Sequence, residues 1–317
     1  MIELLTRVGF MDYEDALMAK AAWYYYFQGM TQQQISERIG ISRIRVIRLL
    51  EKARQTGIIQ FSLRKGNEER LNIENQLMET YGLEDVFVVP SPADPSQINA
   101  NIAEAASMYI NERLHEGSVI NIGYGDTPSR VLNNLATMAE QTITCVSLTG
   151  GVSYYLPDAR SNVFNARLYL IPAPLLASSK EMADAIHQES SVKEISRMIS
   201  LAQLTVVGIG SMDQAATIVH SGILNSNDLQ YLAMQGAKGD NLGHFVDENG
   251  QLIHSSIEDR LIATSTEKLR KLNNVIGVAA GQVKAEAILA VLKGHILDTL
   301  ITDTDTAEAI LAVDHQL

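Results

Sequence analysis

Residues 31–55 read TQQQISERIGISRIRVIRLLEKARQ, and this stretch decides the fold of the N-terminal region. Thr31 can cap a helix, and Gln34 stands at the spacing of a capping box. Gly40 permits a tight turn after that helix, and Ser42 can cap a second helix that fills the rest of the stretch. A capped helix, a glycine turn and a second capped helix together predict a helix-turn-helix.

The second helix of this motif has an apolar face and a basic face. With 100° between consecutive residues, Leu49 and Leu50 flank Val46, and Ile44 and Arg48 lie on the opposite side. Isoleucines exposed beside arginines fit a major groove, because arginine pairs with guanine edges and apolar groups contact thymine methyl groups. Hydroxyls and helix N-termini can contact phosphates. The residues predicted to contact DNA are Thr31, Gln32, Ser42, Arg43, Ile44, Arg45, Ile47 and Arg48.

The neighbouring segments complete a small domain. Residues 12–28 are predicted to be a helix whose aromatic cluster, residues 23–27, forms a small core rather than a base-stacking platform. Residues 58–63 alternate weakly, as a wing strand does, and residues 66–81 predict a charged linker helix that could also carry a dimer seam. The alternative, an arginine-rich solvated helix inside some larger fold, does not account for the two caps, the glycine turn and the wing-like strand.

Charge is divided unevenly along the chain. The net charge of −12 argues against nucleic-acid binding, but residues 1–66 hold ten Lys and Arg against six Asp and Glu, a charge of +4. The remaining residues carry −16. A basic segment on an acidic protein is the electrostatic footprint of a small DNA-binding head.

The length of the chain predicts two domains, and its low cysteine content predicts a reducing compartment. The 317 residues exceed what one hydrophobic core usually organises, and the 46% hydrophobic content is that of a globular protein. The single cysteine, Cys145, excludes a disulfide framework, and no membrane-length apolar run or signal peptide occurs. We therefore expect a cytoplasmic protein with no membrane partner. The expected domains are a helix-turn-helix at 1–65, a linker helix at 66–83 and an α/β domain at 84–317.

The C-terminal part alternates short apolar runs with helical patterns. This alternation predicts a Rossmann-like α/β domain, with a largely parallel sheet that is covered on both faces. Ligands of such sheets bind beyond the carboxyl ends of the strands. The predicted strands are 86–89, 119–122, 143–148, 168–171, 204–209, 275–278 and 300–301. The predicted helices lie near 97–115, 128–140, 180–188, 191–200, 283–293 and 306–312.

Residues suited to a ligand follow several of these strands. Residues 123–128 read GYGDTP, where glycines allow backbone amides to approach an anion and proline suits the first helical turn. Residues 149–151 add a second glycine loop, although such turns are also common without a ligand. Asp240 could accept sugar hydroxyls or be a solvated loop acid. Lys284 begins a helix, where a cation opposes the helix dipole, so we expect an anionic partner there.

Further short motifs run along the chain. They are IPAPL at 171–175, VGIGS at 207–211, GAKGD at 236–240, KAEAI at 284–288 and ITD at 301–303. Together with the helix-turn-helix, they resemble the motifs of the SorC family of sugar-responsive transcription regulators, and the resemblance covers nearly the whole chain.

The resemblance implies a function and a ligand site. It implies an effector domain like the sugar-phosphate isomerases, a phosphorylated sugar or polyol as effector, double-stranded operator DNA as partner, and a repressor that forms a dimer or tetramer. It assigns hydroxyl binding to Asp240, phosphate binding to Lys284, and a wall to Asn165 and residues 172–174. The ligand-binding residues that it implies are Gly123, Tyr124, Gly125, Thr127, Asn165, Asp240, Leu242 and Lys284.

Two other classes of function remain to be weighed. A sugar-phosphate isomerase could use Asp240 and Lys284 for acid–base chemistry, and a ligand-independent DNA-binding protein would need neither. The sequence lacks the nucleophile turn, the His-Glu zinc motif and the Walker loop, and its seven histidines have no metal-ligand spacing. We therefore expect a regulator without enzymatic activity, metal or cofactor.

Overall fold

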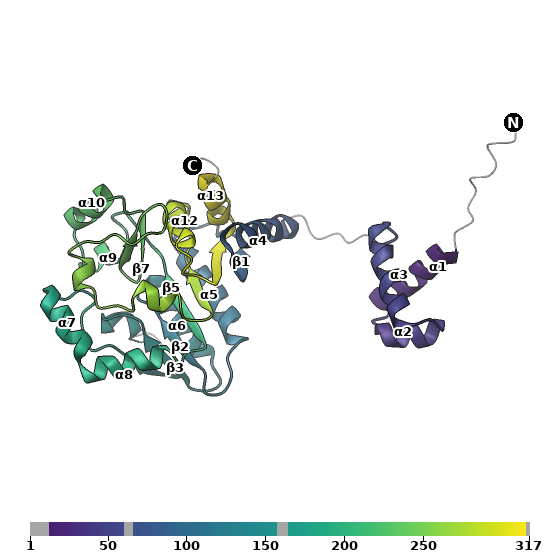
Figure 1. Ribbon diagram of the computed structural model, residues 1–317, viewed down its shortest axis with the longest axis horizontal. Helices are drawn as coiled ribbons and strands as arrows, with labels where there is room; N and C mark the ends of the chain where they lie inside the picture. Colours follow the sequence, from purple (N-terminus) through teal and green to yellow (C-terminus); the bar gives the residue numbers. More distant parts are fainter. Residues whose placement is uncertain (1–12, 60–65, 157–163, 315–317) are drawn as a thin grey trace. The chain divides into compact units, whose positions relative to one another are not determined.

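The computed structural model describes residues 13–59, 66–156 and 164–314. The chain divides into two compact units, Met1–Asn67 and Glu68–Leu317, whose helices and strands are drawn in Figure 1. Helix α4 (Asn67–Tyr81), at the position predicted for the linker helix, packs on the larger unit, where its residues Leu77 and Tyr81 are buried.

The smaller unit is built around the predicted helix-turn-helix. Thr31 and Gln34 form the predicted capping box, and Ser42 caps the second helix of the motif. Gly40 lies between the two helices at a φ of 75°, the left-handed region that glycine adopts without strain. The helices of this unit are α1 (Tyr13–Ala22), the π-helical segment η1 (Trp23–Phe27), α2 (Gln32–Ile39) and α3 (Arg43–Gln55). Its core consists of Leu17, Met18, Ala21, Ala22, Ile35, Val46, Leu49, Leu50 and Ala53.

The aromatic cluster of this unit is not its core, and that prediction was wrong. Trp23 is 52% exposed and Phe27 is 74% exposed, and their rings stack on each other with centroids 4.5 Å apart. The reason is that smaller side chains from α1, α2 and α3 already fill the interior. Of the predicted wing strand, Ile58 and Ile59 lie in a bend, and residues 60–63 are outside the described residues.

The larger unit contains a seven-stranded parallel sheet in which all seven predicted strands are confirmed. The order across the sheet is β1-β10-β9-β5-β2-β3-β4, and every neighbouring pair is parallel. The strands are β1 (Asp85–Val89), β2 (Val119–Ile122), β3 (Ile143–Ser147), β4 (Ala166–Tyr169), β5 (Leu204–Gly208), β9 (Val275–Val278) and β10 (Thr299–Asp303).

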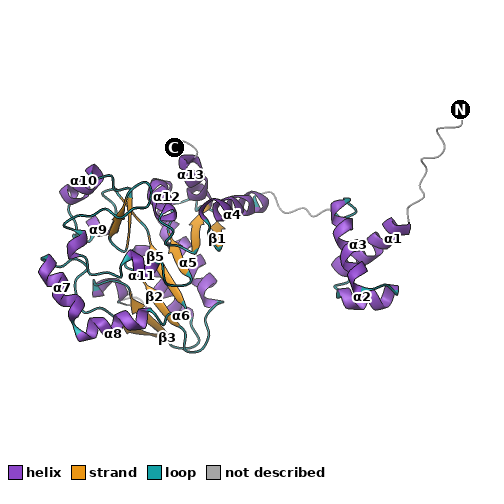
Figure 2. Cartoon of the chain, in the orientation of Figure 1, coloured by secondary structure: helices purple, strands orange, loops and turns teal. Residues whose placement is uncertain are grey.

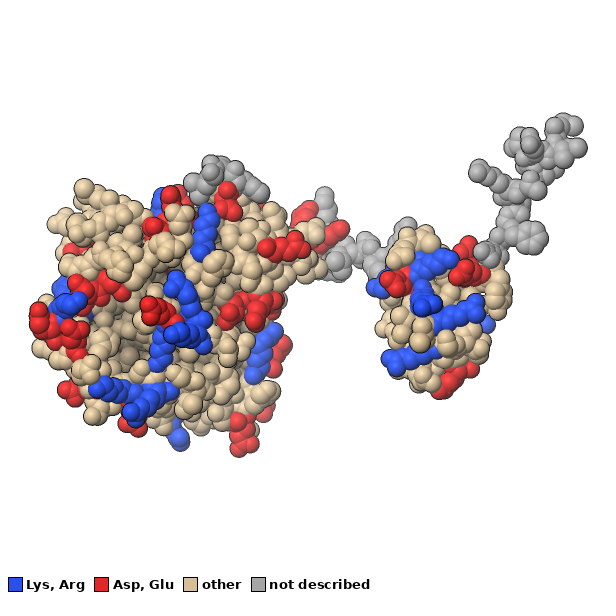
Figure 3. Space-filling model, in the orientation of Figure 1, with Lys and Arg blue, Asp and Glu red and all other residues tan. Residues whose placement is uncertain are grey.

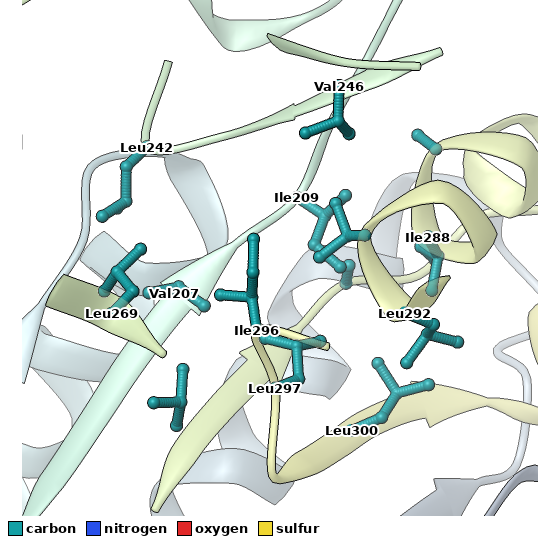
Figure 4. Close-up of a cluster of buried hydrophobic side chains, with 14 of the residues drawn as sticks. Val207, Ile209, Leu242, Val246, Leu269, Ile288, Leu292, Ile296, Leu297 and Leu300 are labelled. Carbon is teal, nitrogen blue, oxygen red and sulfur yellow. The ribbon is translucent and has the colours of Figure 1, made fainter. Parts of the chain in front are cut away.

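Helices cover both faces of this sheet, as Figure 2 shows. One face packs on α5 and α6 through residues such as Ile110 and Leu132, and the other packs on α8, α12 and α13 through residues such as Ile288 and Ile310. Figure 4 shows part of the hydrophobic cluster on the face covered by α8, α12 and α13, where Val207 of the sheet lies near Leu269 and Leu242. The longer helices are α5 (Ile98–Asn111), α6 (Asp126–Met138), α7 (Lys180–Gln188), α8 (Ser190–Ile199), α10 (Ser226–Met234), α12 (Ala285–Lys293) and α13 (Thr304–Asp314).

The sequence patterns missed a small second sheet and several short helices. Strands of two or three residues are too short to show an alternating pattern, so only the structure reveals them. The antiparallel sheet has the order β6-β7-β8. Its strands are β6 (Gly210–Ser211), β7 (Gly239–Asn241) and β8 (His244–Val246). The missed helices are η2 (Pro95–Gln97), η3 (Val152–Tyr155), α9 (Thr217–His220), α10, η4 (Glu258–Arg260) and α11 (Thr266–Leu269). The helix predicted at 283–293 is present as the short segment η5 (Gln282–Lys284) followed by α12.

Candidate effector cavity and DNA-binding face

A cavity of about 490 Å³ lies at the carboxyl ends of the central strands of the larger unit. Strands β2 and β5 are neighbours, but the chain runs from β2 to β3 and β4 on one side and from β5 to β9 and β10 on the other. The crevice between β2 and β5 is therefore the topological switch point, where sheets of this kind bind ligands. Turns that follow β2, β5, β9 and β10 contribute lining residues.

The turn after β2 forms one wall. Residues from Tyr124 to Pro128 line the cavity, and α6 begins at Asp126 without a side-chain cap. Gly125 has a φ of 125°, which disfavours any side chain at that position. Gly123 lies behind this wall, because a Cβ atom there would stand 2.6 Å from the Cδ2 atom of Leu242. The turn predicted to approach a ligand is therefore at the cavity, with Gly123 as a packing residue beneath it.

Asp240 stands in the cavity wall with one carboxylate oxygen unpaired. It is 2% exposed, and its Oδ2 atom accepts hydrogen bonds from the Tyr124 hydroxyl at 2.8 Å and from the Gly243 backbone N–H at 2.9 Å. Its Oδ1 atom is buried and has no hydrogen-bond partner among the described residues. Burial raises the pKa of Asp240 even though Tyr124, Gly243 and Lys284 favour the carboxylate. A buried acceptor normally has a hydrogen-bond partner, so this unpaired oxygen in a residue of the cavity wall singles out Asp240 as a candidate ligand contact.

Gly210 is a residue of this wall that the sequence interpretation missed. It pairs with Asp240 across the small sheet, and a Cβ atom built on it would lie 1.9 Å from Oδ1 of Asp240. Only glycine leaves room for the carboxylate at this point. The VGIGS motif was noted in the sequence, but the partner that requires the second glycine is 30 residues away in the chain.

Lys284 lies in the turn that follows β9, the strand next to β5. It is the only Lys or Arg among the described lining residues, and its Nζ atom is 3.4 Å from the carbonyl oxygen of Ile209. Burial lowers the pKa of Lys284. The nearby carboxylates of Asp240, Asp213 and Asp126 oppose this effect, but the pKa stays below its usual value. Three carboxylates therefore lie near Lys284, but among the described residues none forms an ion pair with it, so the expected anionic partner stays a prediction.

Four further aspartates line the cavity and were not predicted as site residues. Asp126 accepts hydrogen bonds from Asn99 and from Arg130, both at 2.9 Å. Asp303 accepts from Ser91 and Thr306. Asp126 and Asp303 lie within the GYGDTP and ITD motifs at the ends of predicted strands, so the sequence could have identified both as candidate site residues. The four residues are Asp126, Asp213, Asp303 and Asp305.

Four of the implied ligand contacts do not line this cavity: Gly123, which lies behind its wall, Asn165, Leu242 and residues 172–174. Asn165 precedes β4 and therefore lies at the amino end of the sheet, where it donates to the Ala139 carbonyl and accepts from Thr142. Leu242 is 1% exposed and packs behind Gly123. Residues 172–174 pack against the glycine loop 149–151 instead of lining the cavity. The structure does bring together Tyr124, Gly125, Thr127, Asp240 and Lys284.

The smaller unit carries the predicted basic face. Ile44 is 64% exposed and Ile47 is 39% exposed, whereas Val46 between them is fully buried. Arg43, Arg45 and Arg48 are exposed on the same helix. Figure 3 shows several Lys and Arg side chains on the visible face of this unit, with Asp and Glu side chains among them and at its edge. The Thr31 and Ser42 hydroxyls serve as helix caps, and Gln32 is half-buried at the start of α2.

Other kinds of site are not indicated in the described part of the chain. Across residues 13–59, 66–156 and 164–314, no group of three or more His, Cys, Asp or Glu side chains could hold a metal ion. Over the same residues, no helix is long and apolar enough to span a membrane.

Comparison with known proteins supports both halves of this description. Residues 65–312 match the family model of a sugar-binding domain, and residues 23–56 match the model of sigma-70 region 4, a helix-turn-helix. The chain is 34% identical over 304 residues to the transcriptional regulator LsrR of Enterobacter sp., covering 95% of this chain and 94% of that protein. It is 35% identical over 302 residues to LsrR of Escherichia coli K12, covering 94% and 95%.

Solved structures show the same architecture. The full-length sorbitol operon regulator SorC of Klebsiella pneumoniae aligns with a TM-score of 0.67 and 28% identity, covering 93% of this chain and 98% of that chain. A sugar-binding domain of a transcriptional repressor from Vibrio fischeri aligns with a TM-score of 0.69 at 22% identity, which shows the shared fold. With a helix-turn-helix, a sugar-binding domain and relatives that match almost end to end, this chain belongs to the SorC family of sugar-binding transcriptional regulators.

Proposed function

We propose that this protein is a repressor whose effector is a phosphorylated sugar or polyol bound in the cavity at the switch point. The observation that carries the proposal is that Asp240, a buried residue with an unpaired Oδ1 atom, and Lys284 line the same cavity. A carboxylate that only accepts hydrogen bonds selects a ligand that donates them, and a sugar hydroxyl is such a donor.

The charge of the cavity narrows the ligand class further. Among the described lining residues, five aspartates face one lysine, so a ligand with negative charge spread along its length would be repelled. A sugar or polyol with its charge concentrated in one phosphate avoids this repulsion if the phosphate lies against Lys284. The uncapped N-terminus of α6 can add backbone N–H groups to the same anion. The hydroxyl end of the ligand would then lie toward Asp240 and Tyr124.

DNA binding is proposed to require two heads. Helix-turn-helix proteins bind as dimers to half-sites that lie about 34–36 Å apart, one turn of the double helix. We propose that protomers assemble as a dimer or tetramer that presents two α3 helices to successive major grooves. Effector binding would change the affinity for operator DNA by about 1–3 kcal/mol, the usual size of such a coupling.

Anisotropy of labelled DNA from upstream of the gene tests the proposal. Hexose and pentose phosphates, polyol phosphates, the same compounds without phosphate, and inorganic phosphate would each be titrated into the protein–DNA complex. We expect release by one or more phosphorylated compounds and little effect of the unphosphorylated ones. No effect from the whole panel would count against the effector class, and consumption of a sugar phosphate by the protein alone would instead indicate an isomerase.

A pair of lysine variants sharpens the assignment of the phosphate. Lys284→Ala removes the charge-assisted contact and should weaken the active compound by about tenfold or more, with DNA affinity unchanged. Lys238→Ala is the matched control, because Lys238 pairs with Glu286 at the surface and does not line the cavity. A Lys284→Ala protein that responds like the wild type would refute the phosphate role.

A further inference from the structure

The hairpin β7–β8 carries Asp240 and has little structure of its own to hold it. Each of its strands has three residues, and a hairpin of this size is marginally stable by itself. The turn places Leu242 at a φ of 57° and Gly243 at 86°, the two positive values of a type I′ turn. A leucine in this region is strained, so contacts outside the hairpin must hold the turn in place.

One of these contacts joins the hairpin to the main sheet. The Asn241 side chain donates to the carbonyl oxygen of Gly208 at 2.9 Å, at the end of β5. Leu242 fills the space that Gly123 leaves open at the end of β2. The hairpin is therefore fixed to both strands of the switch point on its cavity side.

Besides its pairing with β6, the hairpin has a further contact through a buried histidine that follows the turn. His244 is 5% exposed, and its Nδ1 atom lies 2.9 Å from Oε1 of Glu258 while its Nε2 atom lies 2.9 Å from the carbonyl oxygen of Thr264. A carbonyl and a carboxylate both accept hydrogen bonds, so the ring satisfies both only when each nitrogen carries a proton. Glu258, itself mostly buried, supplies the opposite charge that such a ring needs.

The partners of His244 are themselves anchored to the main sheet. Thr264 donates through its backbone N–H and its hydroxyl to the carbonyl oxygen of Leu148, immediately after β3. Its neighbour Ala263 forms a β-bridge with Thr149. His244 thus connects the hairpin that carries Asp240 to the carboxyl end of a third strand of the sheet.

We infer that His244, through its contacts with Glu258 and with the carbonyl oxygen of Thr264, is a positioning residue that fixes the β7–β8 hairpin and so the orientation of Asp240 toward the effector. The inference rests on the proposed function for its link to the effector, but the position of the hairpin can be measured without any ligand. The ionisable groups that interact with the His244 ring in the described structure are Glu258 of η4 and Asp240 of β7.

Hydrogen exchange of backbone amides 239–246 in the full-length protein tests this inference. We expect exchange to become about tenfold faster in His244→Gln and in Glu258→Gln, which is the effect of losing one charge-assisted hydrogen bond. Asp259→Asn is the matched control, because the neighbouring Asp259 pairs with Lys180 at the surface. Glu258→Gln keeps the size of the side chain and serves if His244→Gln folds poorly. Amides of β2 and β5 report whether each variant keeps its sheet.

A double-mutant cycle separates positioning through this contact from a general loss of packing. If His244 and Glu258 act through the hydrogen bond between them, exchange of the hairpin in His244→Gln/Glu258→Gln should be no faster than in the single variants, because the same contact is already lost. Equal protection of the hairpin in the wild type and both single variants, or fully additive losses in the double variant, would overturn the inference. Because no effector is present, these outcomes are independent of whether a phosphorylated sugar is the ligand.

Discussion

The two units of this protein build their binding surfaces in opposite ways. The face of the smaller unit that we propose to contact DNA lies on one continuous helix, where exposed Ile44 and Arg48 alternate with buried Val46. The cavity of the larger unit joins Tyr124, Asp240 and Lys284, which come from three separate parts of the chain. A helix displays its binding residues through local periodicity, whereas a cavity at strand ends depends on how distant segments meet. Substitutions should therefore act locally in the first unit and through packed neighbours in the second.

The largest effect on this comparison is expected from Gly210→Ala. The added Cβ atom would collide with the Asp240 carboxylate, so we expect the response to effector to be lost while DNA affinity without effector is unchanged. Effector titration of the protein–DNA complex measures both. A double-mutant cycle on thermal stability is the control. Gly210→Ala should destabilise the wild-type protein but not the Asp240→Ala variant, because the colliding carboxylate is absent there. An intact effector response in Gly210→Ala would show that the effector does not need Asp240 in its present position.

Ile35→Ala tests whether the smaller unit depends on its own core. Ile35 is fully buried there, and removing a side chain of this size from a core costs about 2–5 kcal/mol. We expect thermal unfolding followed by circular dichroism to show an earlier transition for this unit and an unchanged transition for the larger one. Ile44→Ala is the control, since Ile44 is 64% exposed and its loss should change stability by less than about 0.5 kcal/mol. A single shifted transition for the whole chain would contradict independent cores.

The same contrast explains what the sequence could predict. Local signals were enough for the capping box at Thr31, the turn at Gly40 and the seven strands of the parallel sheet, because each depends on neighbouring residues or on a short apolar run. Cavity residues within the GYGDTP turn were found because strand ends are known ligand positions. Asn165 was assigned to the ligand from the family resemblance alone, although it precedes the predicted strand 168–171 and therefore belongs at the amino end of the sheet.

Other features depended on tertiary contacts that no local pattern shows. The need for Gly210 arises from Asp240, and the role of His244 arises from Glu258 and Thr264, all of them distant in the chain or in separate elements. The aromatic residues of η1 were expected in the core because large apolar side chains usually are. Smaller residues of α1, such as Leu17 and Met18, occupy that interior instead.

A smaller effect is expected from Arg48→Ala on the recognition helix. If Arg48 contacts a base edge, its loss should weaken operator binding by about 1–3 kcal/mol and relax the sequence preference at one position. Binding to operator variants at constant salt concentration measures both quantities. Arg197→Ala, which removes an exposed arginine from α8 of the larger unit, controls for the change in net charge. Operator binding as tight as that of the wild type would remove Arg48 from the reading surface.

The smallest expected effect is a pH-dependent difference in stability between the wild type and Asp240→Asn. Burial raises the pKa of Asp240 in the folded protein above its value in the unfolded chain. A raised pKa means that the protonated form favours the folded state, so this contribution to stability is present at low pH and is lost as pH rises through the folded-state pKa. Asparagine is neutral throughout and can still accept from Tyr124 and Gly243, so the variant should match the wild type in acid and become the more stable of the two near neutral pH. Thermal unfolding of the larger unit across this pH range measures the difference in stability. If the wild type instead became more stable relative to Asp240→Asn as pH rises, the cavity would stabilise the charged carboxylate without any ligand.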